Sequence, residues 1–373
     1  MKSKTNLTFW LLTTCLVFSC ERQSGGHTSP LAFESITHWK TVSWVDAVVE
    51  TSDGVYLIAG QTNGNIFVGA FDSHGDSLWI RELNVSDRPF ALFEQDDGNI
   101  DIFAWRSFVK TNSVGDIIFT KLWPDRLYPV SVKRAMSGNY LIVGETDSSS
   151  VGVSSAYFLA ESDPTGTLIW TVSIPGPHGL NNNYYNYGWS LLENGNNGIV
   201  VAGTEYYATE PVGATVIMQI GGNGYEPYKL AWQKTYSSLR LWRPYLFRQE
   251  AASLAIAGEG LDGKLNLLCA TSSGDSIETI QTIDIQFLQD AIADHDPNHL
   301  VLLSTRQVAV GNSDVFLTKV TLQGDTLWSR SFGGPGNEGC YRTVLTSDGG
   351  YIMAGKSDVD IYLIKVENSG QLE

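Results

Sequence analysis

The segment TSDGVYLIAG at residues 51–60 returns near the other end of the chain as TSDGGYIMAG at residues 346–355. Each copy places an Asp-Gly turn before an apolar run that ends in Gly, a pattern typical of a tight hairpin that leads into a buried strand. Weaker copies lie at residues 138–144 and 198–203, and degenerate ones at residues 99–104, 253–258 and 298–304. The chain therefore repeats one unit seven times, with a mean period of about 49 residues.

A second pattern, GDSLW at residues 75–79, has the same phase. It returns as GDTLW at residues 324–328 and as GTLIW at residues 166–170. An aromatic residue stands eight positions before the first Gly of each copy, at Phe67, Phe316 and Phe158. Each unit thus predicts four short antiparallel strands, and repeats of this period are typical of propellers. We predict an all-β, seven-bladed β-propeller of four-stranded antiparallel blades over residues 36–373.

The ends of the chain predict how the ring closes. The last unit stops at residues 369–373, where its fourth strand should begin. The segment HWKTV at residues 38–42 has the pattern of the Trp-led fourth strands, such as WIREL at residues 79–83. An N-terminal strand that completes the last blade would remove two exposed sheet edges. We therefore expect residues 36–43 to close the ring; an open solenoid is the alternative, and it would need polar caps.

The start of the chain, MKSKTNLTFWLLTTCLVFSC, places two lysines before a short apolar run. This run is shorter than the roughly 20 residues that span a bilayer and is typical of a secretory signal peptide. Its end, LVFSC at residues 16–20, resembles a bacterial lipobox, which implies a signal peptide over residues 1–19 and lipidation of Cys20. Residues 20–35 are mostly polar and are expected to form a flexible tether. An ordinary signal peptide with a chance cysteine is the alternative.

These features predict that the protein is located in the bacterial cell envelope. The protein is expected to be held at the outer membrane by its lipid anchor, on the periplasmic side or exposed at the surface. Forty acidic residues stand against 24 basic ones, giving a formal net charge of −16. Since such a field repels a phosphate backbone, no nucleic-acid partner is expected. We also expect a monomer. The sequence holds no nucleophile elbow, phosphate-binding loop or zinc motif, so no bound metal and no catalytic residues are expected.

The repeats resemble those of secreted bacterial β-propeller proteins over about residues 36–373. They are also distantly similar to the tryptophan-docking repeats of pyrroloquinoline-quinone dehydrogenases, in which an Asp, a Gly and a Trp of each blade lock it to its neighbour. Asp72, Gly75 and Trp79 match that pattern, but the turn is shorter and there are seven units instead of eight, so no cofactor is expected. Large recurrent aromatics are expected to pack between blades, at Trp39, Trp79, Trp170, Trp232 and Trp328.

Two sets of residues are candidates for a binding site. Counting back from the hairpin turns places Asp46, Asp290 and Arg342 at equivalent positions on the innermost strands of neighbouring units, near the mouth of the channel. They form either an ion pair between blades or a polar ligand or metal site. The second set lies in the long connections of the fourth and fifth units, on one rim of the ring. Its members are Tyr184, Tyr185, Tyr187, Tyr206, Tyr207, Arg240, Trp242 and Arg243.

Aromatic faces beside guanidinium donors suit stacking on sugar rings, and Tyr, Trp and Arg also dominate protein-binding hot spots. Loops held by a rigid scaffold are where binding residues concentrate. The sequence therefore predicts a binding protein whose rim takes a glycan or a partner protein. Two alternatives stay open. The aromatics could pack onto the blades, or the protein could be an enzyme with a site at the channel mouth, either a quinoprotein-like oxidoreductase or a polysaccharide-active enzyme.

Overall fold

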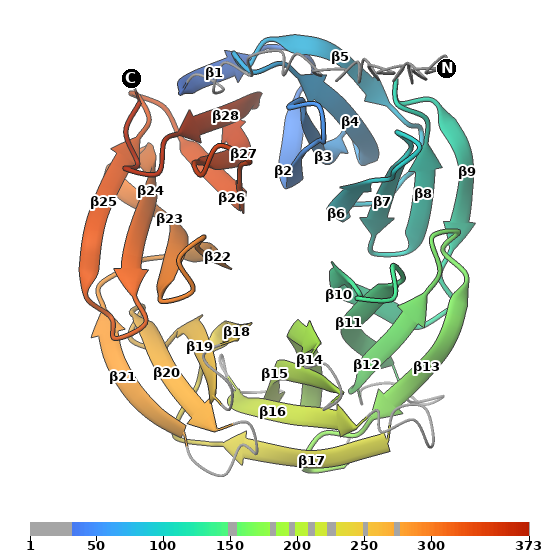
Figure 1. Ribbon diagram of the computed structural model, residues 1–373, viewed down its shortest axis with the longest axis vertical. Coiled ribbons are helices and arrows are strands. Elements are labelled where there is room, and N and C mark those ends of the chain that lie inside the picture. Colours follow the sequence, from blue (N-terminus) through green and yellow to red (C-terminus); the bar gives the residue numbers. More distant parts are fainter. Residues whose placement is uncertain are drawn as a thin grey trace, which may run out of the picture.

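Seven four-stranded antiparallel sheets stand around a central axis in the computed structural model, which confirms the predicted seven-bladed β-propeller (Figure 1). The structure describes residues 32–147, 155–179, 184–193, 198–207, 213–221, 229–248, 253–271 and 277–372. Cys20 and most of the expected tether lie outside these residues. In the described part of the chain no helix is suited to crossing a membrane.

Each blade follows the chain from the innermost strand outward. Blade 1 contains β2 (Val42–Glu50), β3 (Tyr56–Thr62), β4 (Asn65–Phe71) and β5 (Ser77–Glu82). Blade 2 contains β6 (Pro89–Glu94), β7 (Ile100–Ala104), β8 (Ser107–Thr111) and β9 (Ile117–Leu122). Blade 3 contains β10 (Leu127–Arg134), β11 (Tyr140–Asp147), β12 (Ser155–Ser162) and β13 (Leu168–Ile174). Blade 4 contains β14 (Tyr184–Glu193), β15 (Ile199–Tyr207), β16 (Ala214–Gly221) and β17 (Lys229–Tyr236).

The last three blades complete the ring. Blade 5 contains β18 (Trp242–Arg248), β19 (Ser253–Glu259), β20 (Leu265–Thr271) and β21 (Ile277–Ile283). Blade 6 contains β22 (Leu288–Ala293), β23 (His299–Ala309), β24 (Asn312–Thr321) and β25 (Thr326–Phe332). Blade 7 contains β26 (Glu338–Leu345), β27 (Tyr351–Ser357), β28 (Asp360–Val366) and, from the other end of the chain, β1 (Phe33–Thr37).

The N-terminal strand closes the ring as predicted, but it spans Phe33–Thr37 and overlaps the expected residues 36–43 only at Ile36 and Thr37. β1 pairs antiparallel with β28, with Phe33 opposite Lys365. Residues 38–41 of the expected segment instead form the connection into β2, where the ring of Trp39 lies 5.4 Å from that of Phe67. The propeller therefore begins at Phe33, within the expected tether. The predicted bounds were wrong because Trp39 fits the sequence pattern of an outer-strand aromatic. In the structure, Phe33 occupies that position.

The aromatic ring of an outer strand packs against a glycine in a hairpin turn of the next blade. A Cβ on Gly115 of blade 2 would lie 2.6 Å from Cζ3 of Trp79 in blade 1, and one on Gly370 would lie 2.7 Å from Cζ3 of Trp328. Phe33 takes the same place under Gly75, at 2.4 Å. Trp170 and Trp232 pack against core clusters shared by blades 3 and 4 and by blades 4 and 5. Trp39 packs against a core cluster shared by blades 1 and 7, so the expected packing role holds for all five tryptophans.

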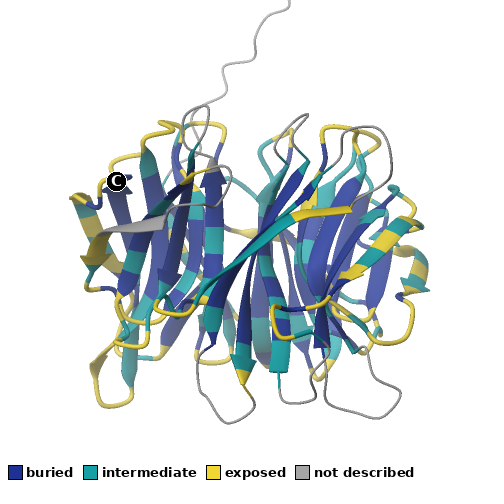
Figure 2. Ribbon diagram, turned by 90° about the horizontal axis from the view of Figure 1, so that it is seen from below, coloured by how far each residue is buried: buried dark blue, intermediate teal, exposed yellow. Residues whose placement is uncertain are grey.

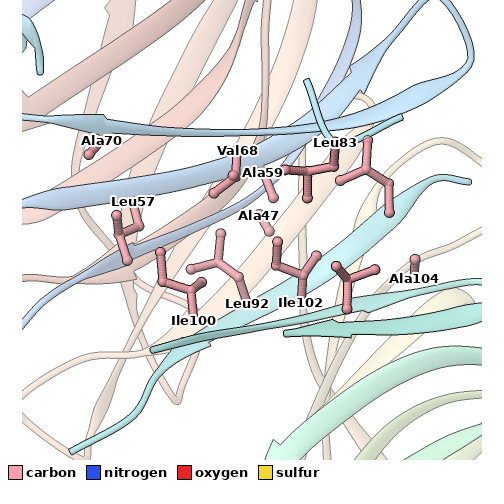
Figure 3. Close-up of a cluster of buried hydrophobic side chains, with 12 residues drawn as sticks. Ala47, Leu57, Ala59, Val68, Ala70, Leu83, Leu92, Ile100, Ile102 and Ala104 are labelled. Atoms are coloured by element: carbon pink, nitrogen blue, oxygen red, sulfur yellow. The ribbon is translucent and has the colours of Figure 1, made fainter. Parts of the chain in front are cut away.

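The hydrophobic core is divided among the blade interfaces. Figure 3 shows one such cluster, in which Leu57 and Val68 of blade 1 face Leu92, Ile100 and Ile102 of blade 2. Buried residues run along the strands, and exposed ones gather at the turns and the outer strands (Figure 2). Each blade thus buries its two faces against its neighbours, as expected for units that cannot form a core alone.

All seven innermost strands contain a β-bulge near the same level. The bulge pushes its backbone toward the second strand of the blade. A Cβ on Gly60 would lie 2.1 Å from the carbonyl oxygen of Trp44, and one on Gly355 would lie 1.9 Å from that of Gly339. The glycine that ends the repeated motif is therefore required by this close approach of two backbones.

Candidate functional site

The candidate residues lie at the face where the innermost strands begin, which we call the entry face. Tyr184 starts β14, Trp242 starts β18, and Tyr207 ends β15, which runs antiparallel to β14. The Asp-Gly hairpin turns lie at the opposite face, since they follow the other ends of the innermost strands. The predicted rim is thus formed by blades 4 and 5.

The predicted rim residues lie mainly on strands, which corrects the expectation of long loops. β14 is ten residues long, and its first rungs pair Tyr184 with Tyr207 and Tyr185 with Tyr206. Trp242 and Arg243 belong to β18, and Arg240 alone lies in the connection before it. Tyrosine favours the half-buried surface of a sheet, and this explains why these segments extend the ladder.

Four rings from three strands form one contiguous group, which we call the aromatic surface. The centroid of Tyr187 lies 5.1 Å from that of Tyr206 and 5.7 Å from that of Trp189. The ring of Trp242 lies 6.0 Å from Trp189 and 6.4 Å from Tyr206. Trp242 is 37% exposed, whereas the other three are half-buried. Sequence reasoning missed Trp189, the bulge residue of β14, although it follows Tyr187 within the same aromatic segment.

A second aromatic pair extends this surface along the entry face of blade 4. The rings of Tyr184 and Tyr207 lie 5.3 Å apart, and Tyr207 is 38% exposed. His178 stacks on Tyr184 at 4.3 Å and contacts the buried Glu205 through Nδ1 at 2.8 Å. The buried carboxylate thus fixes the imidazole, which in turn supports the tyrosine. No repeat or motif marked His178 and Glu205 in the sequence, because the contact depends on how the connection folds back.

Two charged groups border the aromatic surface. The Arg243 guanidinium lies 5.6 Å from the ring of Trp189, and its buried Nε has no hydrogen-bond partner in the described residues. Arg243 also has a φ of 50°, which is strained for a residue with a side chain. On the other side, Glu145 of β11 shares a hydrogen bond with Tyr187, and burial raises the pKa of the Glu145 carboxyl to about 7. Glu145 was not predicted.

The channel-mouth residues come together, but in a different register from the predicted one. Asp290 and Arg342 both follow a bulge, and Arg342 Nη1 lies 3.6 Å from Asp290 Oδ1. Asp46 lies one position earlier, inside the bulge of β2. Gly349, with a φ of 87°, is the counterpart of Gly54, and the hairpin turn before β23 is one residue longer than that before β3. Counting back from Gly350 and from Asn298 therefore gives positions one residue later than that of Asp46.

Contacts within this cluster form a continuous polar network across blades. Arg342 Nε donates to the Asp46 carbonyl oxygen at 3.0 Å, and the Asp46 carboxylate accepts from Nε and Nη2 of Arg88 at 2.7 and 2.8 Å. Asp290 also accepts from the Thr343 amide at 3.0 Å, although burial raises the pKa of its carboxyl. Each carboxylate has a protein partner, so the contacts fit the ion-pair interpretation better than a ligand or metal site.

No cluster of three or more His, Cys, Asp or Glu side chains is placed to hold a metal ion within the described ranges. Neither Cys269 nor Cys340 forms a disulfide in the described part of the chain, and Cys340 is buried.

Comparisons with known proteins reveal the fold alone. No protein-family model matches this chain, and no curated protein matches it. Among solved structures, a streptogramin B lyase is similar over 89% of this chain and 97% of its own, with 12% identity and a TM-score of 0.56. A catalytically inactive virginiamycin B lyase from Staphylococcus aureus with quinupristin is 10% identical, covering 89% and 99%, with a TM-score of 0.57.

The WD40 domain of Pan2 from Neurospora crassa is 9% identical, covering 88% of this chain and 90% of its own, with a TM-score of 0.52. Lyases and a WD40 domain therefore share this architecture. Because one fold hosts unrelated activities, the function has to be argued from the site.

Proposed function

We propose that the protein is a binding protein that takes a neutral glycan on the aromatic surface of blades 4 and 5. The observation that supports this is the contiguous group of rings from β14, β15 and β18, with Trp242 exposed at one end. Aromatic faces suit the apolar faces of sugar rings. The flanking Arg243 and Glu145 supply a donor and a carboxyl for hydroxyl groups, as binding sites with a few oriented polar groups require.

Charge favours a neutral ligand at this surface. The chain carries a formal net charge of −16, which disfavours strongly acidic ligands. Glu145, with its pKa near 7, is partly protonated at neutral pH and can both donate to and accept from a hydroxyl. A partner protein is the other occupant that such Tyr, Trp and Arg side chains suit.

Truncation of the exposed rings tests this proposal. Trp242→Ala and Tyr207→Ala should each weaken binding of neutral oligosaccharides by about 1–3 kcal/mol without lowering the melting temperature. Titration calorimetry against neutral glucose, xylose and mannose oligomers measures the first effect, and thermal unfolding measures the second. Met136→Ala is a matched control, since Met136 is 70% exposed in a hairpin turn of the opposite face.

Two outcomes would contradict a glycan site. If the variants lose stability while binding is intact, the rings serve packing. If no neutral oligomer binds but Trp242→Ala abolishes capture of a protein partner, the surface recognises protein.

A polysaccharide-active enzyme is the second candidate, and Glu145 is the observation that favours it. A carboxyl with a pKa near 7 beside a stacking surface is suited to proton donation at neutral pH. Asp147 follows two residues later on the same strand and raises that pKa further. Binding ranks first because it needs only the ring faces, whereas hydrolysis needs a second carboxylate across the bond. Release of new reducing ends that is lost in Glu145→Gln would reverse this order.

We also propose that Cys20 carries a lipid that holds the propeller at the bacterial outer membrane. The support is the basic start, the short apolar run and the Ser-Cys junction of the sequence. Cys20→Ala should leave the protein uncleaved or release it into the soluble fraction, as fractionation and N-terminal mapping would show. Cys15→Ala, within the same apolar run, should leave anchoring unchanged. A mature N-terminus away from residue 20 would contradict lipidation.

A further inference from the structure

A second set of aromatic and basic side chains lies at the entry face on blades 1, 2 and 7, away from the aromatic surface. Its most exposed member is Trp105, at 47%, in the two-residue turn between β7 and β8. Blades 1 and 2 lie on the other side of the central axis from blades 4 and 5 (Figure 1). None of these residues belongs to the surface proposed above.

A buried carboxylate fixes the turn that presents Trp105. Asp87 is 8% exposed, and its Oδ2 accepts from the Arg106 amide at 2.9 Å and from Ser107 Oγ at 2.7 Å. Its other oxygen accepts from the Arg88 amide at 2.8 Å. The Trp105 amide donates to the Arg88 carbonyl oxygen at 3.1 Å. The exposed indole is therefore held by a rigid backbone.

Arg88 stacks between two indoles. Its guanidinium carbon lies 4.3 Å from the ring of Trp44 and 5.2 Å from that of Trp105. The bidentate contact with Asp46 holds this guanidinium in place and balances its charge. The ring of Tyr341 meets Trp44 edge-on at 5.4 Å. Trp105 is thus supported by a packed stack, while nearly half of its surface faces solvent.

Lys356 adds a positive charge that has no acidic partner. Its Nζ lies 5.4 Å from the ring of Trp44, and within the described residues no carboxylate lies within 4.0 Å of it. Since Asp46 already pairs with Arg88, Lys356 is the cation of this group that has no carboxylate partner among the described residues. A cation over an aromatic ring without a counter-ion is positioned to receive an anion.

We propose that Trp44, Arg88, Trp105 and Lys356 form a second binding site, for an oligosaccharide of carboxylate-bearing sugars. One sugar ring stacks on the exposed indole of Trp105, and the carboxylate of another ring of the same oligosaccharide pairs with the Lys356 ammonium. The stack is already assembled and hydrogen-bonded, so little side-chain entropy is lost on binding. This site stands apart from the blade 4 and 5 surface, and its test does not depend on that surface.

The experiment compares galacturonate oligomers with their methyl esters, which keep the rings and lose the charge. The full chain should bind the acidic oligomer about ten- to a hundredfold more tightly, as expected for one charge-assisted contact. Raising the salt concentration should narrow this preference. Lys356→Met should bring the two ligands to equal affinity, while Trp105→Ala should weaken both by at least about fivefold.

Two control variants test whether the changes in affinity come from ligand recognition and not from misfolding or from a change in overall charge. Lys121→Met removes a half-buried cation from the outer strand β9, and Met136→Ala removes an exposed apolar side chain from the opposite face. Neither should change the preference or the affinity. Equal binding of acid and ester by the unaltered protein, no binding of either ligand at millimolar concentration, or a preference that survives Lys356→Met would each overturn the proposal.

Discussion

At the scale of single residues, the repeated motif owes its final glycine to the bulge on the neighbouring strand. Gly144 and Gly203 of blades 3 and 4 show the same relation as Gly60 and Gly355, with a Cβ 2.1 and 2.6 Å from the carbonyl oxygens of Tyr128 and Tyr187. These glycines lie inside buried strands, where glycine is otherwise unfavourable. The close approach of the bulge explains why the motif keeps it.

Gly355→Ala should therefore destabilise the propeller by about 1–3 kcal/mol or more, because the added methyl has to displace the Gly339 carbonyl. Denaturant unfolding measures this change. Gly334→Ala is the matched control: a Cβ there meets nothing within 4 Å, so its unfolding free energy should stay close to that of the unaltered protein. Equal stability of the two variants would show that the bulge relaxes without cost.

The hairpin turns limit how precisely single residues can be placed from the sequence. The repeats predict the second strand of each blade correctly, because apolar runs and turn glycines can be recognised in the sequence. The turns differ in length between units, so counting back from Gly54, Asn298 and Gly350 gives Asp46 the position of Asp290 and Arg342, although it lies one residue earlier. Likewise Glu145 and Trp189 became site residues only when three blades were brought together.

At the scale of strands, the outer aromatic and the turn glycine of the next blade form one interlocking pair. Trp79 with Gly115, Trp328 with Gly370 and Phe33 with Gly75 are three examples of it. Each glycine has a positive φ, which keeps the turn tight and leaves room for the ring. The ring closure thus uses the same contact as the other blade junctions, with Phe in place of Trp.

Phe33→Ala should lower the melting temperature, since it removes the ring that fills the space under Gly75; about 2 kcal/mol is expected for a half-buried phenyl group. Ile36→Ala, on the same strand but 51% exposed, should have little effect. Differential scanning calorimetry on both variants tests this. If Ile36→Ala destabilises as much as Phe33→Ala, the contribution comes from strand pairing and not from the interlock.

Prediction of this strand succeeded in topology and failed in position for a physical reason. The missing outer strand of the last unit required a partner from the N-terminus, and β1 supplies it. Its location depended on one aromatic, and the chain offers two, Phe33 and Trp39, six residues apart. Only packing distinguishes them, because Trp39 finds its contact with Phe67 in the connection to blade 1.

At the scale of the whole molecule, stability depends on a closed ring of neighbour contacts. The core clusters each join adjacent blades, so removal of one junction leaves two faces exposed. The two candidate sites also arise at this scale, since each collects residues from two or three blades. Sequence patterns within one repeat cannot predict such sites, which explains why the group around Trp105 was not foreseen.

The spacing between the two chain ends at the ring closure would allow these ends to be joined and the chain to be opened at another place. Joining Leu372 directly to Ala32 would place Phe33 four residues after Gly370, the spacing of Trp79 after Gly75. The joined chain would make blade 7 continuous, with the antiparallel hairpin that the other blades have between their third and fourth strands.

Two circular permutants of this joined chain then measure what closure by strand pairing contributes. One begins at Gly115, in the turn between β8 and β9, and so keeps a blade shared by both chain ends. The other begins at Asp125, between blades 2 and 3, and leaves the ring closed by side-chain packing alone. Both should fold, because all seven blades are intact in each. The permutant that begins at Asp125 should have a melting temperature several degrees lower, because in it no strand pairing between the two chain ends opposes their separation. Equal melting temperatures would mean that packing between blades, and not the shared blade, holds the ring together.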